Sequence, residues 1–142
     1  MRTLILAGAL LLAGCMEAPV AKPAPAPVSA SLAGSEWQVE TLAGAPVGTA
    51  RVTMAFTADR VAGSSGCNRY TGGWSGSGSG IKFGMMAGTR MACMDEALSR
   101  LEADFLKFLG DASSWRIDNG VLTVKTADGR ALTARAATPA PR

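Results

Sequence analysis

The sequence predicts an α+β fold, namely a mainly antiparallel β-sheet or partly closed barrel with one amphipathic helix packed on it. Two observations favour this class. Short segments alternate apolar with polar residues and are separated by Asn-Gly and Asp-Gly pairs, which is the pattern of antiparallel hairpins. One segment, 94–109, instead repeats its apolar residues every three or four positions. The order of early strands, one helix and a final group of strands is that of an α+β domain.

The first two strands are expected at 37–42 and 52–56, with the odd-numbered residues of the first, from Trp37 to Thr41, on one face. Residues 60–64 are expected to return as a partner strand after a short turn. The stretch 72–80 is rich in glycine, so it predicts a flexible loop flanked by short strands.

The helix is expected to run for about four turns, with Gly110 at its C-cap. Asp95 and Glu96 would lie in its first turn, where acidic groups complement the helix dipole. Its polar face mixes both charges, so packing on the sheet is favoured over a place on a membrane surface. The apolar stripe that would pack on the sheet consists of Met94, Ala97, Leu98, Leu101, Phe105, Phe108 and Leu109.

A three-stranded meander is expected at the C-terminal end of the domain. Its strands are 115–117, 121–126 and 130–135, and the turns between them contain Asn119-Gly120 and Asp128-Gly129. The residues expected on one buried face are Ile117, Leu122, Val124 and Leu132.

The N-terminus has the pattern of an export signal. A positive start at Arg2 is followed by an apolar run of about ten residues, which is shorter than the roughly 20 that span a membrane. Residues 12–15, Leu-Ala-Gly-Cys, resemble the bacterial lipobox, which implies cleavage before Cys15 and lipid attachment to its sulfur. The alternative is an ordinary secretory signal that carries a cysteine. The resemblance implies attachment to the bacterial cell envelope. It favours the outer membrane, facing the periplasm, over the inner membrane, because Met16 and not aspartate follows the cysteine.

The expected organisation follows from composition. Residues 1–14 form a lipoprotein signal peptide, and 15–33 form the lipidated cysteine and an Ala/Pro-rich stalk. Residues 34–136 form the folded domain, and 137–142 form a disordered tail.

Charge and residue counts exclude several functions. The chain of 142 residues contains no histidine, which excludes Ser-His-Asp and Cys-His catalysis and zinc sites that use imidazole. Removing residues 1–14 removes one arginine, which leaves 13 basic against 11 acidic side chains. No run of basic residues interleaved with aromatic ones is present in the sequence, so nucleic acid is not an expected partner.

A set of motifs in the folded domain resembles one known family. The motifs are Gly66-Cys67-Asn68 with Tyr70, Thr89-Arg90-Met91-Ala92-Cys93, Glu102-x-x-Phe105-Leu106-x-x-Leu109, Trp115, and Gly120-Val121-Leu122-Thr123-Val124. In this order they resemble the META domain, formerly a domain of unknown function, whose family includes the heat-shock protein HslJ and similar lipoproteins. The resemblance implies a small β-rich domain, often tethered at the bacterial envelope and linked to heat shock and antibiotic tolerance. It carries no established catalytic residues.

Cys67 and Cys93 are the cysteines that remain beside Cys15. An even pair in an exported chain most often forms a disulfide, which would stabilise a domain of this size. A redox pair normally has C-x-x-C spacing, and a zinc site would need further cysteines or histidines, so both alternatives are weaker. No metal and no cofactor is expected.

The candidate surface lies beside this disulfide. Asn68, Arg69, Tyr70, Thr89 and Arg90 could bind an envelope component through hydrogen bonds. The alternative is that Asn68 and Thr89 satisfy turn backbone while Tyr70 packs in the core.

Glu102 is the carboxylate to weigh for chemistry, and the family match suggests that it has a fixed partner, either a backbone amide or Arg90. A structural role is favoured, because half-buried carboxylates are usually hydrogen-bonded for reasons of fold. No catalytic residue is assigned, since no base–nucleophile set can be composed from the sequence.

We therefore expect a lipid-anchored, non-catalytic protein of the cell envelope with a binding, structural or stress-related role, and with the membrane and an unidentified envelope component as partners. The chain is expected to be a monomer. The competing hypothesis is an inhibitor of an envelope hydrolase, such as a protease or lysozyme, that presents the glycine-rich stretch as a loop.

Overall fold

The structure, a computed structural model, describes residues 31–137. This part of the chain forms ten β-strands and one α-helix. In chain order they are β1 (Glu36–Leu42), β2 (Ala45–Pro46), β3 (Thr53–Phe56), β4 (Arg60–Ser64), β5 (Arg69–Ser77), β6 (Gly80–Phe83), β7 (Ala87–Gly88), α1 (Glu96–Asp111), β8 (Ala112–Asp118), β9 (Val121–Thr126) and β10 (Ala131–Ala136).

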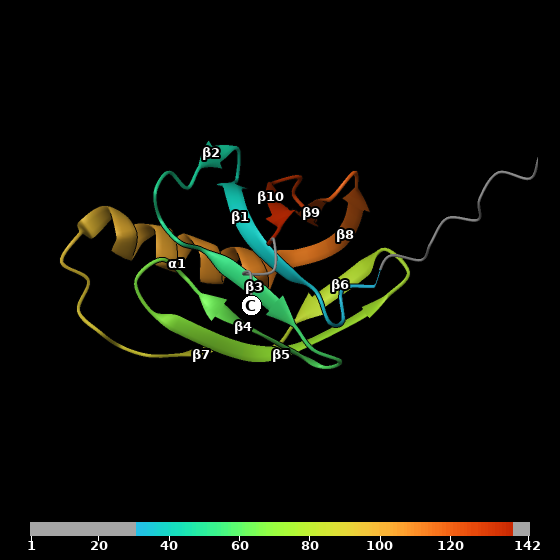
Figure 1. The fold of residues 1–142 in the computed structure, drawn as a ribbon, viewed down its shortest axis with the longest axis horizontal. Helices are drawn as coiled ribbons and strands as arrows, with labels where there is room; N and C mark the ends of the chain where they lie inside the picture. Colours follow the sequence, from blue (N-terminus) through green and yellow to red (C-terminus); the bar gives the residue numbers. More distant parts are fainter. Residues whose placement is uncertain (1–30, 138–142) are drawn as a thin grey trace, which may run out of the picture.

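Eight strands close into an antiparallel barrel (Figure 1). Around the barrel the order is β1, β3, β4, β5, β6, β8, β9 and β10, and β10 then pairs with β1. The two short strands β2 and β7 pair with β1 and β5 and lie outside this ring. The predicted fold class is therefore confirmed, and the barrel is closed.

The barrel wall is weakest where β6 meets β8. These strands share one pair in register, Gly80 with Ser114, together with a 2.8 Å bond from the Trp115 amide to the Ser79 carbonyl. Neighbouring strand pairs share up to six such pairs. Helix α1 lies between β6 and β8 in the chain, so these two strands are not joined by a short hairpin turn.

The core fills the barrel and the space beneath α1. The helix contributes Phe105, Phe108 and Leu109, and the meander contributes Leu122, Val124 and Leu132, all at most 1% exposed. The predicted buried face of the meander is confirmed, with Ile117 partly buried against the core.

Strand β1 differs from its predicted alternation. A β-bulge between Val39 and Thr41 shifts the pairing with β10, so Leu42 faces the core and Thr41 does not. The extra residue of a bulge reverses the side-chain direction that follows it, which period-two reasoning does not anticipate.

The glycine-rich stretch 72–80 is not a flexible loop. Strand β5 continues through it to Ser77, a two-residue turn follows at Gly78-Ser79, and β6 starts at Gly80. Glycine at position 72 allows close packing and does not indicate mobility, because a Cβ there would lie 2.4 Å from the sulfur of Met86. The hypothesis of a long presented loop loses its basis.

The helix limits also shift. Asp95 is the N-cap, its side chain accepting a 2.8 Å bond from the Ala97 amide, and the helix continues through Gly110 to Asp111. Gly110 is thus inside the last turn and is not the C-cap. Met94 precedes the helix and is fully exposed, so it does not belong to the packed stripe.

The N-terminal limit of the domain lies before residue 34. Leu32, placed in the stalk by composition, is 1% exposed and is part of the core. The signal peptide, Cys15 and almost all of the stalk and tail lie outside the described residues. Within residues 31–137 there is no helix with the length and apolar character needed to span a membrane.

Candidate functional site

The side chain of Glu102 is the centre of a hydrogen-bonded cluster between α1 and the β4–β5 connection. Its Oε2 accepts bonds from the Ser65 hydroxyl at 2.6 Å and from the Asn68 amide at 2.9 Å. Its Oε1 accepts a 2.9 Å bond from Nδ2 of Asn68. These bonds join α1 to the turn that follows β4, which ends at Ser64, directly before Ser65.

These bonds lower the pKa of Glu102. Partial burial tends to raise the pKa of this carboxyl, but the bonds from Ser65 and from both donors of Asn68 outweigh it and hold the pKa below its ordinary value of 4.5. Glu102 is therefore an ionised acceptor at neutral pH. A group in this state is unsuited to acting as a general acid.

Further hydrogen bonds of the Asn68 side chain link Glu102 to the segment that precedes α1. Its Oδ1 accepts bonds from the Thr89 hydroxyl at 2.9 Å and from the Met91 amide at 2.7 Å, and its Nδ2 also donates to the Met91 carbonyl at 3.3 Å. Asn68 is 5% exposed, so its polar atoms are used inside the protein.

Cys67 and Cys93 form a disulfide, as predicted, with their Cα atoms 6.0 Å apart. It joins the β4–β5 turn to the residues that lead into α1. Both sulfur atoms and a Glu102 oxygen lie within 4.8 Å of one another. Both sulfur atoms are in the disulfide and both oxygens of Glu102 accept hydrogen bonds, so this group does not form a metal site.

Two of the five residues predicted to form a binding surface are buried, and three are exposed. Tyr70 is 3% exposed, stacks edge to face on Phe105 and donates a 2.8 Å bond to the Thr53 carbonyl. Burial raises the pKa of its hydroxyl, which stays a neutral donor. Asn68 and Tyr70 are therefore buried, as the alternative interpretation of these residues expected, and they do not form part of an exposed surface.

Arg69, Thr89 and Arg90 are exposed. Thr89 still has a backbone role, since its hydroxyl accepts a 3.1 Å bond from the Arg69 amide. The fixed partner expected for Glu102 is a backbone amide, that of Asn68. In the described part of the chain Glu102 has no ion pair with Arg90. A hollow of about 430 Å³ opens between Arg90, Cys93 and Glu102.

Two members of the cluster were not predicted. Ser65 is fully buried and pairs through its backbone with Val52, and Met91 contributes only its backbone. The sequence Ser64-Ser65-Gly66 indicates a turn. Nothing in it indicates that Ser65 is bonded to Glu102, which is 37 positions later.

Comparisons with known proteins are consistent with this geometry. The family profile described as the META domain matches residues 30–139. No curated protein matches the chain.

Two solution structures have similar folds. One, described as the NMR structure of the protein, is 25% identical, with a TM-score of 0.59, and the match covers 72% of this chain and 88% of that one. The other, from Burkholderia xenovorans, is 24% identical, with a TM-score of 0.61 and coverage of 86% and 98%. The crystal structure of a DUF4847 family protein from Bacteroides vulgatus is 15% identical, with a TM-score of 0.54 and coverage of 78% and 96%.

Proposed function

The chain belongs to the META domain family, and from this membership and the arrangement of its polar residues we propose that it is a non-catalytic binding or structural module of the bacterial cell envelope with a stress-related role. A lipid on Cys15 would anchor it, at the outer membrane facing the periplasm. The observation that carries the non-catalytic part is the Glu102 cluster. Its carboxylate, hydroxyl and amide groups are bonded to one another and join three segments of the chain.

This arrangement supports a scaffold role. Ser65 is the hydroxyl that is bonded to Glu102, but it is fully buried and also donates to the Asn68 carbonyl at 2.9 Å. Nucleophilic catalysis needs a hydroxyl that a substrate can reach, next to a base that can take its proton. A carboxylate that accepts three bonds and stays ionised instead stabilises the turn that carries the disulfide.

The anchor is proposed on the lipobox-like residues 12–15. Two or three acyl chains give stable membrane attachment, whereas one is marginal. The test is radioactive palmitate labelling of the full-length chain in a Gram-negative host. We expect Cys15→Ala to abolish labelling and release the protein from the membrane fraction, while the neighbouring change Met16→Ala leaves both intact. Labelling that persists in Cys15→Ala would contradict the anchor.

The binding role is tested by crosslinking in intact envelopes followed by mass spectrometry of the captured material. Reproducible capture of an envelope component by the anchored wild type, but not by a variant destabilised at Glu102, supports the proposal. If the protein captures no more material than a control lipoprotein of unrelated fold does, the proposal is contradicted. The alternative role as a hydrolase inhibitor has no supporting observation, because the expected loop is the tight hairpin of β5 and β6.

A further inference from the structure

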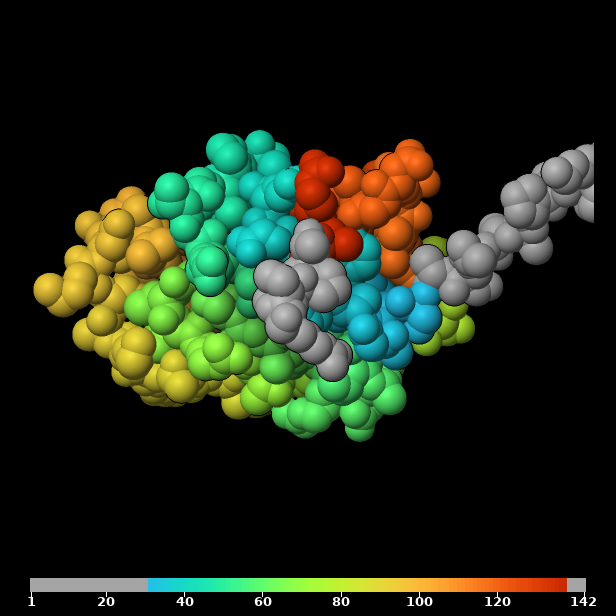
Figure 2. All heavy atoms as spheres, in the orientation of Figure 1, coloured from blue at the N-terminus to red at the C-terminus, as the bar shows by residue number. Residues whose placement is uncertain are grey.

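Three methionine side chains extend into solvent from residues 84–95, the segment that contains β7 and leads from β6 to α1. Met85 is 95% exposed, Met91 is 65% exposed and Met94 is fully exposed. They are the exposed large apolar side chains within residues 31–137. Figure 2 shows the yellow atoms of residues 89–95 at one end of the domain, away from the blue atoms of residues 31–36. The open apolar side chains of this part of the protein are therefore all thioethers and all belong to one segment.

The backbone of this segment, and not its methionine side chains, attaches it to the domain. The Thr89 amide donates a 3.0 Å bond to the Arg69 carbonyl. The amide and the carbonyl of Met91 are both bonded to the side chain of Asn68, at 2.7 and 3.3 Å. The disulfide fixes the next part of the segment through Cys93. A chemical change at the three thioethers leaves all of these contacts in place.

The remaining sulfur atoms that the structure describes are sheltered or already oxidised. Met54 is 0% exposed and lies in the core. Met86 is partly buried against the core, and its sulfur would lie 2.4 Å from a Cβ placed on Gly72. Cys67 and Cys93 are joined in the disulfide, so neither offers a thiol. Open, reduced sulfur in residues 31–137 is thus restricted to the three exposed methionines.

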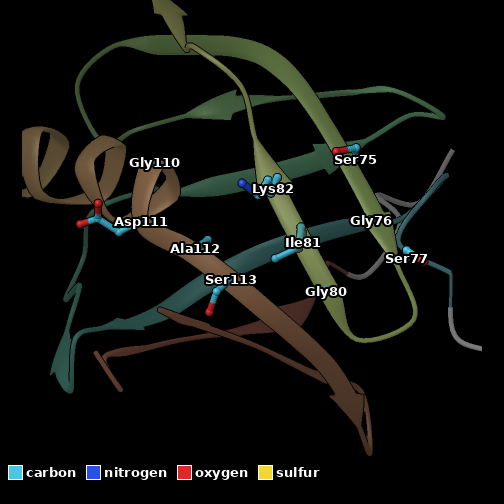
Figure 3. A pocket seen from close by; sticks show the side chains of 10 residues that line it. All are labelled: Ser75, Gly76, Ser77, Gly80, Ile81, Lys82, Gly110, Asp111, Ala112 and Ser113. Carbon is cyan, nitrogen blue, oxygen red and sulfur yellow. The ribbon is translucent and has the colours of Figure 1, made fainter. Parts of the chain in front are cut away.

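The hollow near the junction of β6 with β8 contains no such group. It measures about 570 Å³ and lies between the β5–β6 hairpin and the junction of α1 with β8 (Figure 3). The residues that line it include no methionine and no cysteine. The exposed thioethers therefore face bulk solvent and do not belong to this hollow.

From their exposure and from the backbone attachment of the segment, we propose that Met85, Met91 and Met94 are sites of reversible oxidation. Hypochlorous acid and related electrophilic oxidants convert their thioethers into sulfoxides while the domain stays folded. Thioether sulfur is soft and polarizable, and its susceptibility to oxidation follows its exposure. The inference rests on the proposed stress-related role and names the stress as oxidative.

The oxidation removes two electrons from sulfur. The sulfur lone pair attacks the chlorine of hypochlorous acid, so an S–Cl bond forms, the O–Cl bond breaks and hydroxide leaves. Water then adds to sulfur, chloride leaves and two protons are released, one of which neutralises the hydroxide. The net products are the sulfoxide, chloride and one proton. A methionine sulfoxide reductase reverses the change: its thiols are oxidised to a disulfide, and the sulfoxide oxygen leaves as water.

Exposure also explains why the fold survives this modification. Sulfoxide formation disrupts proteins where it makes a packed methionine polar. At side chains that are 65% exposed or more, the new oxygen is hydrated and no packed contact is lost. The same change at Met54 would place an unpaired polar oxygen in the core.

The first experiment adds sodium hypochlorite stepwise to the full-length chain in detergent at pH 7, and mass spectrometry of peptides follows each methionine. We expect Met85, Met91 and Met94 to be oxidised at least about tenfold faster than Met54, with Met86 between them. The protein with three sulfoxides should unfold at a Tm within about 4 °C of that of the untreated protein. Oxidation of Met54 as fast as that of the exposed three, or unfolding of the protein with three sulfoxides, overturns the proposal.

The second experiment measures how much oxidant the segment consumes. The triple variant Met85→Leu/Met91→Leu/Met94→Leu keeps apolar side chains of similar size at exposed positions, so it should fold like the wild type. Oxidation of Met54 should begin at about three equivalents less of hypochlorite in this variant, because three thioethers are missing. Met86→Leu is the matched control from the same segment and should shift that point by less than about one equivalent. An equal requirement in the wild type and the triple variant overturns the proposal.

Reversibility is tested in cells that are treated briefly with hypochlorite. We expect sulfoxides at the three positions to appear, to disappear after the oxidant is removed, and to persist in cells that lack the methionine sulfoxide reductases of the envelope. Sulfoxides that fail to form, or that persist in both strains, overturn the proposal. Palmitate labelling of Cys15 is a separate readout, so a chain that is oxidised at the three positions but carries no lipid contradicts the anchor and not this inference.

Discussion

Asn68 and Glu102 are joined twice, through the backbone amide and the side-chain amide of Asn68, each at 2.9 Å from a different carboxylate oxygen. The two residues are 34 positions apart. Their pairing fixes α1 against the β4–β5 turn, and through the Thr89 and Met91 bonds it also fixes the segment that precedes the helix. One carboxylate thus organises three segments.

Replacing Glu102 with glutamine should lower the free energy of unfolding by about 2 kcal/mol. Hydrogen bonds to a charged acceptor are lost, and the NH₂ group of the new side chain faces the donors of Ser65 and Asn68. Urea denaturation at pH 7 measures the change. Glu96→Gln is the matched control on the same helix, since Glu96 is 79% exposed and pairs only with Arg100. Its effect should stay below about 0.5 kcal/mol. Equal stabilities of the two variants would contradict the role of the cluster.

The stability contributed by Glu102 should depend on pH in a defined direction. Its folded-state pKa is below the ordinary value of 4.5, so the unfolded chain binds the proton more readily. The contribution is fully present above that ordinary value and is lost as pH falls through the lower folded pKa. The stability difference between the wild type and Glu102→Gln should therefore be constant from pH 7 to about pH 5 and shrink in more acidic solution. A difference that grows in acid would show the opposite shift.

Reduction of the Cys67–Cys93 disulfide should destabilise the domain by about 3.5 kcal/mol, the chain-entropy value for a closed loop of this length. The double variant Cys67→Ala/Cys93→Ala, measured by denaturation without reductant, should show the same loss. Cys15→Ala is the control and should leave unfolding unchanged. If the reduced and oxidised proteins unfold at the same denaturant concentration, the disulfide does not constrain this domain.

Gly63 should tolerate no side chain. A Cβ at this position of β4 would lie 2.1 Å from the Thr53 carbonyl oxygen on β3 and 2.7 Å from its carbon. Gly63→Ala therefore forces the strands apart and should cost roughly 3 kcal/mol or more, as overpacking of a rigid core does. Gly110→Ala should instead stabilise by up to about 1 kcal/mol through helix propensity. Thermal unfolding of the two variants compares them, and a stable Gly63→Ala would contradict the close contact.

Local patterns predicted the hairpins and the helix, the cysteine count in an exported chain predicted the disulfide, and the motif order suggested the backbone amide that is bonded to Glu102. Three features were not predicted, and the first of them depends on a partner far along the chain. The bulge in β1 is imposed by pairing with β10. The glycine-rich stretch becomes strand because β4 lies on one side and β6 on the other. Gly110 stays helical because the Ala112 amide bonds to the Leu109 carbonyl and β8 begins at once.

The short register between β6 and β8 could not be predicted either. In the sequence each of the two strands has only the pattern of a hairpin, β6 with β5 and β8 with β9, and nothing in it sets how they align with one another.

Closure of the barrel by its first and last strands has a kinetic consequence. Thr41 and Thr133, 92 positions apart, are joined across β1 and β10 by a 2.6 Å bond between their hydroxyls. A chain that emerges N-terminus first, from a ribosome or through a translocation channel, cannot form this ring until β10 has followed. Contacts so distant in sequence slow folding, and until they form, the edge of β1 is open to pairing with other chains. The six residues of β10 therefore complete the barrel, and the time until they emerge is the interval during which the edge of β1 is exposed to other chains.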